Sequence, residues 1–80
     1  MPKLTLYHTF SCHLCEMAEA LIRDYFTAHG VDVDCLKLVD IADDEALLQR
    51  YGLLIPVLRV DDTGQELNWP FGWDELQSFL

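Results

Sequence analysis

The sequence predicts a single α/β domain over residues 1–80, with a mixed sheet and the element order β-α-β-α-β-β-α. Three observations predict it. After the first apolar run, apolar residues recur at the spacing of one helix face over a long segment. The spacing strand-helix-strand implies a parallel pair of strands with a right-handed crossover. The turn residues Asp61–Gly64 join two short segments that have the pattern of strands. The chain has 80 residues, of which 51% are hydrophobic, so we expect one compact core and no second domain.

The first half of the chain predicts a strand, a long helix and a second strand. Leu4 to His8 is the first strand, and Ser11 is the expected N-cap of the helix. Gly30 stands where a helix ends in a residue of positive φ. The run from Val31 to Val39 is mostly apolar, which predicts a strand covered on both faces. The apolar positions of the helix recur with the spacing of one buried face, at Leu14, Met17, Ala18, Leu21, Ile22, Tyr25 and Phe26.

A second, shorter helix is predicted from Asp40 to Tyr51. Acidic residues gather at its start and Arg50 lies near its end, and both match the helix dipole. Gly52 follows at the position expected just past a helix end.

The last third of the chain predicts two antiparallel strands and a closing helix. Val57 to Val60 follows Pro56 and forms the third strand, and Gln65 to Trp69 returns after the turn as the fourth. The closing helix has one apolar face, formed by Trp73, Leu76 and Leu80.

The charge of the chain excludes several classes of partner. Fourteen acidic residues against five basic ones give a net charge of -9, which argues against nucleic acids and anionic membranes. No stretch approaches the roughly 18 apolar residues of a membrane helix, and Met1 does not begin a secretory signal. The odd number of cysteines (Cys12, Cys15 and Cys35) favours a reducing compartment. We therefore predict a soluble, cytoplasmic monomer.

Cys12 and Cys15 lie between the first strand and the long helix. Residues at i and i+3 share a helix face, so the two thiols could form a disulfide there. The free N–H groups of the first helical turn favour a thiolate, and a protonated His13 would add to that effect. Taken alone, the pair is also consistent with part of a zinc site that includes His8 or His13, or with two packed cysteines without chemistry.

The order of the elements, with Cys-x-x-Cys after the first strand and Pro56 before the third, resembles the thioredoxin fold in its minimal, glutaredoxin-like form. The resemblance implies a thiol-disulfide oxidoreductase that reduces protein or glutathione mixed disulfides through Cys12 and Cys15. It implies a cis Pro56 beside the pair, and an Ile55 whose backbone binds substrate like one more strand. No tightly bound cofactor is expected, with glutathione as a candidate co-substrate.

Glutathione binding is the part of the resemblance with most departures. The family's Gly-Gly-x-Asp before the last helix is here Phe71-Gly72-Trp73-Asp74, so Trp73 and Asp74 are the candidate glutathione-binding residues. Thr9 replaces a common lysine, Leu53-Leu54-Ile55 lacks the usual basic residue, and His13 replaces a proline. Losing cations should weaken the binding of an anionic ligand. The ending also resembles redoxins that receive electrons from thioredoxin reductase, so the donor is either glutathione or a thioredoxin-reductase-type protein.

Two alternatives belong to other functional classes. A non-catalytic thioredoxin-fold adaptor would bind proteins in the groove at Pro56, and a metal or iron-sulfur binding module would use the cysteine pair. Cys35 falls in the second predicted strand, where a buried, inert thiol is expected.

Overall fold

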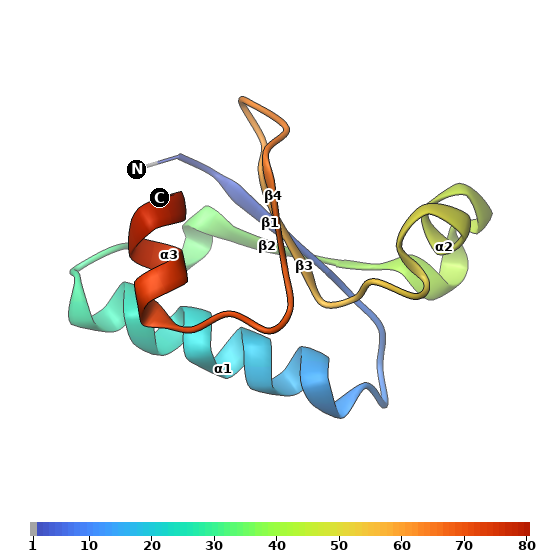
Figure 1. Cartoon of the computed structure of the whole chain (residues 1–80), viewed down its shortest axis with the longest axis horizontal. Helices are drawn as coiled ribbons and strands as arrows, with labels where there is room; N and C mark the ends of the chain where they lie inside the picture. The colour runs from blue at the N-terminus through green and yellow to red at the C-terminus, as the bar shows by residue number, and fades with distance from the viewer. Residues whose placement is uncertain (1) are drawn as a thin grey trace.

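The computed structural model describes residues 2–80 and contains a four-stranded mixed sheet with the strand order β2-β1-β3-β4 (Figure 1). Strand β1 pairs in parallel with β2 and antiparallel with β3, and β3 pairs antiparallel with β4. The elements are β1 (Leu4–His8), α1 (His13–Ala28), β2 (Leu36–Asp40), α2 (Glu45–Tyr51), β3 (Val57–Val60), β4 (Glu66–Asn68) and α3 (Trp73–Phe79). The predicted fold class and element order are confirmed. Within residues 2–80, no helix is both long and apolar enough to cross a membrane.

The main core lies between the sheet and the helices α1 and α3. Successive side chains of a strand point to opposite faces, so Leu4 and Leu6 of β1 face α1 while Thr5 and Tyr7 face the other side. Phe26 of α1 is fully buried in this core. The other buried members are Leu4, Leu6, Ala18, Ile22, Tyr25, Leu36, Leu58, Val60, Phe71 and Leu76.

The buried face of α1 differs from the prediction at its N-terminal end. Leu14 and Met17 are each 46% exposed, whereas Cys15 is only 3% exposed. Ala18 and Tyr25 are buried as expected. Helical periodicity therefore predicts the apolar face of α1, but it does not predict how far along the helix the sheet covers that face. Gly30 has the expected positive φ, at 67°.

The second predicted strand is shorter and more exposed than expected. The segment before it forms a 3₁₀ turn at Val33–Cys35, where the Asp32 carboxylate accepts the Asp34 N–H at 2.9 Å. The strand β2 then runs over Leu36–Asp40 at the edge of the sheet, and it is mostly half-exposed because, among residues 2–80, only β1 pairs with it. The predictions of a strand covered on both faces and of a Cys35 buried within it were therefore wrong, since Cys35 is half-exposed in the turn.

The second predicted helix is divided by two aspartates. The Asp40 carboxylate accepts the Ala42 N–H and starts a 3₁₀ turn at Ile41–Asp43. The Asp44 carboxylate accepts the Leu47 N–H at 3.1 Å and starts α2, which leaves a seven-residue helix. Gly52 directly follows the last residue of α2, as predicted, and its backbone is right-handed with φ -54°. A Cβ at Gly52 would collide with the carbonyl of Leu48, and this close approach favours glycine there.

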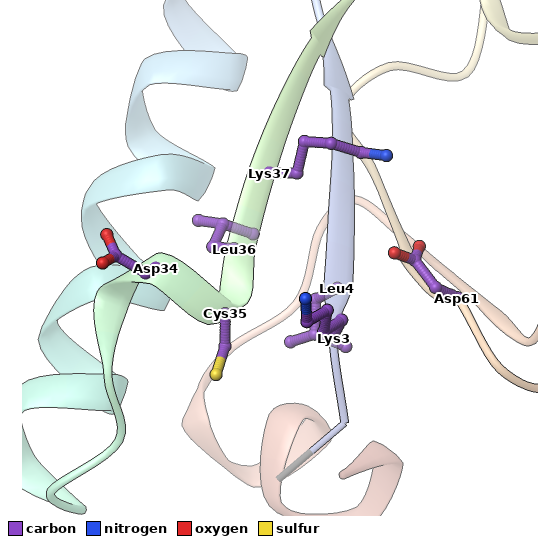
Figure 2. Close-up of a pocket in the computed structure, with 7 residues that line it drawn as sticks. All are labelled: Lys3, Leu4, Asp34, Cys35, Leu36, Lys37 and Asp61. Atoms are coloured by element: carbon purple, nitrogen blue, oxygen red, sulfur yellow. The ribbon is translucent and has the colours of Figure 1, made fainter.

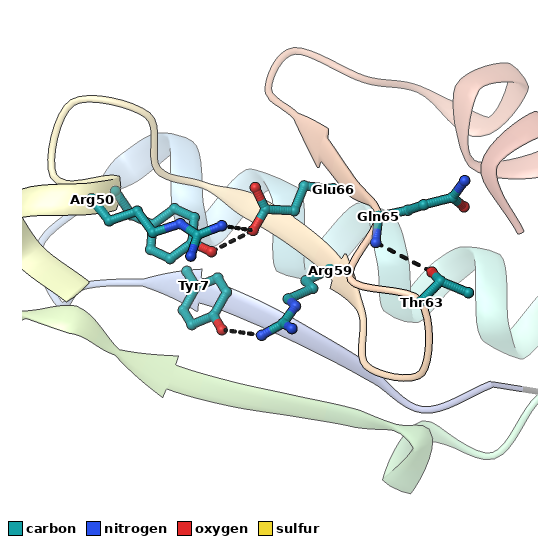
Figure 3. A network of polar contacts seen from close by, with 7 residues as sticks. Tyr7, Arg50, Arg59, Thr63, Gln65 and Glu66 are labelled. Carbon is teal, nitrogen blue, oxygen red and sulfur yellow. Dashed lines mark hydrogen bonds and ion pairs between the residues drawn. The ribbon is translucent and has the colours of Figure 1, made fainter. Parts of the chain in front are cut away.

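A smaller cluster on the opposite sheet face holds α2. The rings of Tyr7 and Tyr51 stack with centroids 4.3 Å apart, beside buried Ile41 and Val57. The Tyr51 hydroxyl donates a hydrogen bond to Glu66 on β4. Figure 3 shows Arg50 directed at the same carboxylate, 3.7 Å away, and Arg59 directed at the hydroxyl of Tyr7. The contacts connect α2 to the sheet.

The unfolding free energy should depend on the protonation of Tyr51 at high pH. Burial, helped by the hydrogen bond to Glu66, raises the pKa of Tyr51 to about 12. Because the folded pKa exceeds the unfolded value of about 10, this stabilisation is complete below pH ~10 and is lost as the pH rises through the folded pKa. Urea unfolding at pH 9, 10 and 11 should therefore show a steeper loss of stability in the wild type than in Tyr51→Phe. Equal slopes in the two proteins would contradict this assignment.

Candidate functional site

The cysteine pair lies where the chain passes from β1 to α1. After His8 the chain turns sharply, and Ser11 takes a left-handed conformation with φ 64°, which is uncommon for residues other than glycine. Cys12 then adopts extended backbone angles and is the N-cap of α1. The predicted N-cap, Ser11, was therefore wrong by one residue, and the cap position belongs to a cysteine.

The structure joins Cys12 and Cys15 in a disulfide, with their Cα atoms 5.2 Å apart. The backbone N–H of Cys15 also points at Sγ of Cys12, with a nitrogen-sulfur distance of 3.2 Å. Cys12 is half-exposed, whereas Cys15 is 3% exposed. A substrate can thus reach Cys12 directly, while Cys15 lies behind it.

The position of Cys12 favours a thiolate when the pair is reduced. The first turn of a helix carries N–H groups without helical partners and a partial positive charge. Sγ of Cys12 already accepts one of these N–H groups, from Cys15. A negative charge on this sulfur would be stabilised by the same contact, and a thiolate is the nucleophilic form of cysteine.

A cleft of about 250 Å³ opens beside the disulfide. Phe10 stands at its rim, 77% exposed, with its ring edge-on to the ring of His8 at a centroid distance of 5.8 Å. Glu16 and Glu19 were not identified from the sequence, although Glu16 follows Cys12 by one helical turn and so shares its face. The cleft is lined by His8, Thr9, Phe10, Ser11, Cys15, Glu16, Glu19 and Leu38.

Ile55 and Pro56 lie at the end of the sheet where β1 finishes and β3 begins. Tyr7 pairs with Val57, so Pro56, directly before β3, lies at the same end of the strands as His8. The Ile55–Pro56 peptide bond is cis, as the resemblance implied, and the Trp69–Pro70 bond is also cis. The Ile55 N–H, however, donates to the carbonyl of Tyr51 at 3.0 Å. This N–H is thus engaged within the chain, and substrate binding by the Ile55 backbone stays a prediction.

The two histidines near the pair lie beside other side chains, His8 beside Phe10 and His13 beside Glu16. The His13 ring lies on the exposed side of the first turn, with Nδ1 3.8 Å from a carboxylate oxygen of Glu16. Within residues 2–80, no three His, Cys, Asp or Glu side chains converge in an arrangement suited to a metal ion.

Trp73 and Asp74 lie far from the cysteine pair. The Trp73 ring packs edge-on against Tyr25 and His29, with centroid distances of 5.6 and 5.9 Å. Tyr25 lies about 18 Å along the helix axis from the start of α1, and Figure 1 shows α3 beginning beside the later part of α1. Asp74 is a first-turn acid of α3, with Gly72 as its N-cap. The structure therefore does not bring these two predicted residues together with Cys12.

Comparison with known proteins gives matches over almost the whole chain. A family model described as Glutaredoxin-like domain (DUF836) matches residues 3–80. The X-ray structure of target protein XcR50 from X. campestris is similar, with 38% identity, 95% of this chain and 92% of that chain covered, and a TM-score of 0.73. The solution structure of Ne2328 from Nitrosomonas europaea has 29% identity, covers 100% of this chain and 93% of its own, and has a TM-score of 0.78. None of the curated proteins matches.

Proposed function

This chain belongs to the glutaredoxin-like domain family, and from that membership we propose that it is a thiol-disulfide oxidoreductase that uses Cys12 and Cys15. The thioredoxin-like fold expected from the sequence is confirmed by the similar structures. The observation that carries the proposal is the position of Cys12, a half-exposed helix N-cap whose sulfur accepts the N–H of the buried Cys15. This arrangement provides an accessible nucleophile with a second thiol directly behind it.

The proposed reaction proceeds in two displacements. The Cys12 thiolate attacks one sulfur of a substrate disulfide, forms a mixed disulfide and releases the other sulfur as a thiolate. Cys15 then loses its proton and attacks the Cys12 sulfur, which forms the Cys12–Cys15 disulfide and releases the second substrate thiolate. The substrate disulfide gains two electrons and the protein dithiol loses two. A donor must return two electrons before the next cycle.

The site geometry favours protein disulfides over glutathione mixed disulfides. Glutathione carries a net negative charge, yet Glu16 and Glu19 line the cleft and no lysine or arginine of the described chain does. Asp74, a candidate glutathione-binding residue, directly follows Trp73, whose ring packs against Tyr25 in the later part of α1. We therefore propose protein disulfides as the substrates. The electron donor is either glutathione or a protein of the thioredoxin-reductase type.

A redox titration tests the proposed function. The purified protein is equilibrated in thiol-disulfide buffers across the range of cellular potentials, quenched by alkylation and analysed by mass. We expect a single two-electron transition that is lost in Cys12→Ser and retained in the control Cys35→Ser. If no disulfide forms at any of these potentials, the oxidoreductase proposal fails and the adaptor alternative takes its place. The same preparation, supplied first with glutathione and glutathione reductase and then with thioredoxin reductase, identifies the donor.

A further inference from the structure

We propose that the cleft beside the dithiol binds a basic side chain of the substrate protein, while Phe10 contacts an apolar side chain near the substrate disulfide. The inference rests on the proposed function and specifies its substrate class: protein disulfides that have a lysine or arginine and a large apolar residue as close neighbours. It follows from the shape of the site, from its charges and from the exposed apolar residues around it.

Glu16 provides the charge at the cleft. It follows Cys12 by one turn and lines the cleft with Glu19. Glu19 already holds Arg23, with a nitrogen-oxygen distance of 2.9 Å. The Glu16 carboxylate lies 3.8 Å from Nδ1 of His13, and its side chain is 73% exposed. Glu16 therefore remains accessible to a cation from a bound partner.

Neither lysine of the sequence lies at the dithiol end. Lys3 and Lys37 line a separate pocket at the start of β1 and β2, beside Cys35 and together with Asp34 and Asp61 (Figure 2). Because β1 and β2 are parallel, that pocket lies at the opposite end of the strands from His8 and the cleft. Asp40 pairs with His8 at the cleft end and adds another acid there. In a chain of net charge -9, the carboxylates of Glu16 and Asp40 at the dithiol end should attract a basic partner there.

Large apolar side chains are exposed on the segment that holds the dithiol. Phe10 is 77% exposed, and Leu14 and Met17 are each 46% exposed on adjacent positions of the first helical turns. These residues lie outside the main core and have no covering element in the described structure. Glutathione has one ammonium group but also two carboxylates that Glu16 and Glu19 would repel, and it has no large apolar group for Phe10. A polypeptide segment offers both a cation and a large apolar group, so the occupant that fits is a protein.

Single-turnover reduction of matched peptide disulfides tests the inference. Three symmetric peptide dimers carry the same cysteine and tyrosine, flanked by lysine and phenylalanine, by glutamate and phenylalanine, or by lysine and serine. Each is mixed with the reduced protein at low salt, quenched with acid and resolved by chromatography. The lysine-phenylalanine dimer should react about tenfold faster than the glutamate-phenylalanine dimer, and 1 M salt should bring the ratio close to one.

Two pairs of variants assign the effects to residues. Glu16→Gln should reduce the lysine-over-glutamate preference several-fold, while Asp24→Asn, which removes the same charge farther along α1, should preserve it. Phe10→Ser should reduce the phenylalanine-over-serine preference, while Val33→Ser, a change of an exposed apolar residue in the distant 3₁₀ turn, should not.

The outcomes separate the inference from the proposed function. If all three dimers are reduced at equal rates, the inference is overturned while the oxidoreductase proposal stands. An unchanged charge preference in Glu16→Gln, or an unchanged apolar preference in Phe10→Ser, overturns the assignment to the respective residue. If none of the dimers is reduced although the protein dithiol is shown to be free, the proposed function itself fails.

Discussion

Cys15→Ser is expected to accumulate a stable mixed disulfide between Cys12 and its substrate, where the wild-type protein accumulates almost none. The reason is the depth of the two sulfurs. Cys12 is half-exposed and can attack a substrate, whereas Cys15 is 3% exposed and is positioned to attack only Cys12. Without Cys15 the second displacement has no internal nucleophile. Incubation with the lysine-phenylalanine peptide dimer followed by intact mass analysis should show one bound peptide per protein.

The complementary variants make this result specific. Cys12→Ser combined with Cys35→Ser should bind no peptide, because the one thiol left in this double variant, Cys15, is buried. Cys35→Ser should behave like the wild type, since Cys35 lies at the other end of β2. Turnover of Cys15→Ser at the wild-type rate would show that Cys15 does not resolve the intermediate, and would leave a mechanism that uses Cys12 alone.

Phe26→Ala should lower the unfolding free energy by about 3–5 kcal/mol. Phe26 is fully buried between α1 and the sheet, in the cluster that also holds α3. Its removal leaves a cavity that this small core cannot refill without moving α1. A domain of this size has roughly 5–15 kcal/mol of stability in total, so the variant should be close to unfolding. Urea unfolding followed by circular dichroism measures the loss.

Phe10→Ala is the matched control for that experiment. It removes the same side chain from a position that is 77% exposed, so the unfolding free energy should change by no more than about 0.5 kcal/mol. A loss in Phe10→Ala as large as that in Phe26→Ala would mean that Phe10 packs in solution in a way that this structure does not show.

Patterns of neighbouring residues predicted much of this molecule. The helix α1 follows from apolar residues spaced by three and four, and Gly30 ends it with the expected positive φ. The hairpin of β3 and β4 follows from the turn cluster between them. The placement of Cys12 at the joint between β1 and α1 follows from the same local signals, since both elements are recognisable without the rest of the chain.

The structure adds to or differs from the sequence predictions where contacts between distant segments decide the arrangement. The run from Val31 to Val39 has the composition of a buried strand, but β2 is an edge strand. The first part of the run, up to Cys35, precedes β2 and includes the 3₁₀ turn. Trp73 and Asp74 follow a family pattern in sequence, yet α3 packs near the end of α1 and removes them from the dithiol. The Ile55 N–H donates a hydrogen bond to the carbonyl of Tyr51, and this contact depends on how the chain passes from the end of α2 to β3.

The sequence by itself determined the order of the elements, the parallel pairing of the first two strands and the position of Cys12 and Cys15 at a helix start. Each of these depends on periodicity, on caps or on connection length, which act over a few neighbouring residues. Only the tertiary structure decided how deeply Cys15 is buried, that Glu16 lines a cleft beside the pair, and that the lysines lie at the opposite end. The burial of a side chain and the distribution of charge depend on segments that are far apart in the sequence. Both are therefore set only when the sheet and the helices pack together.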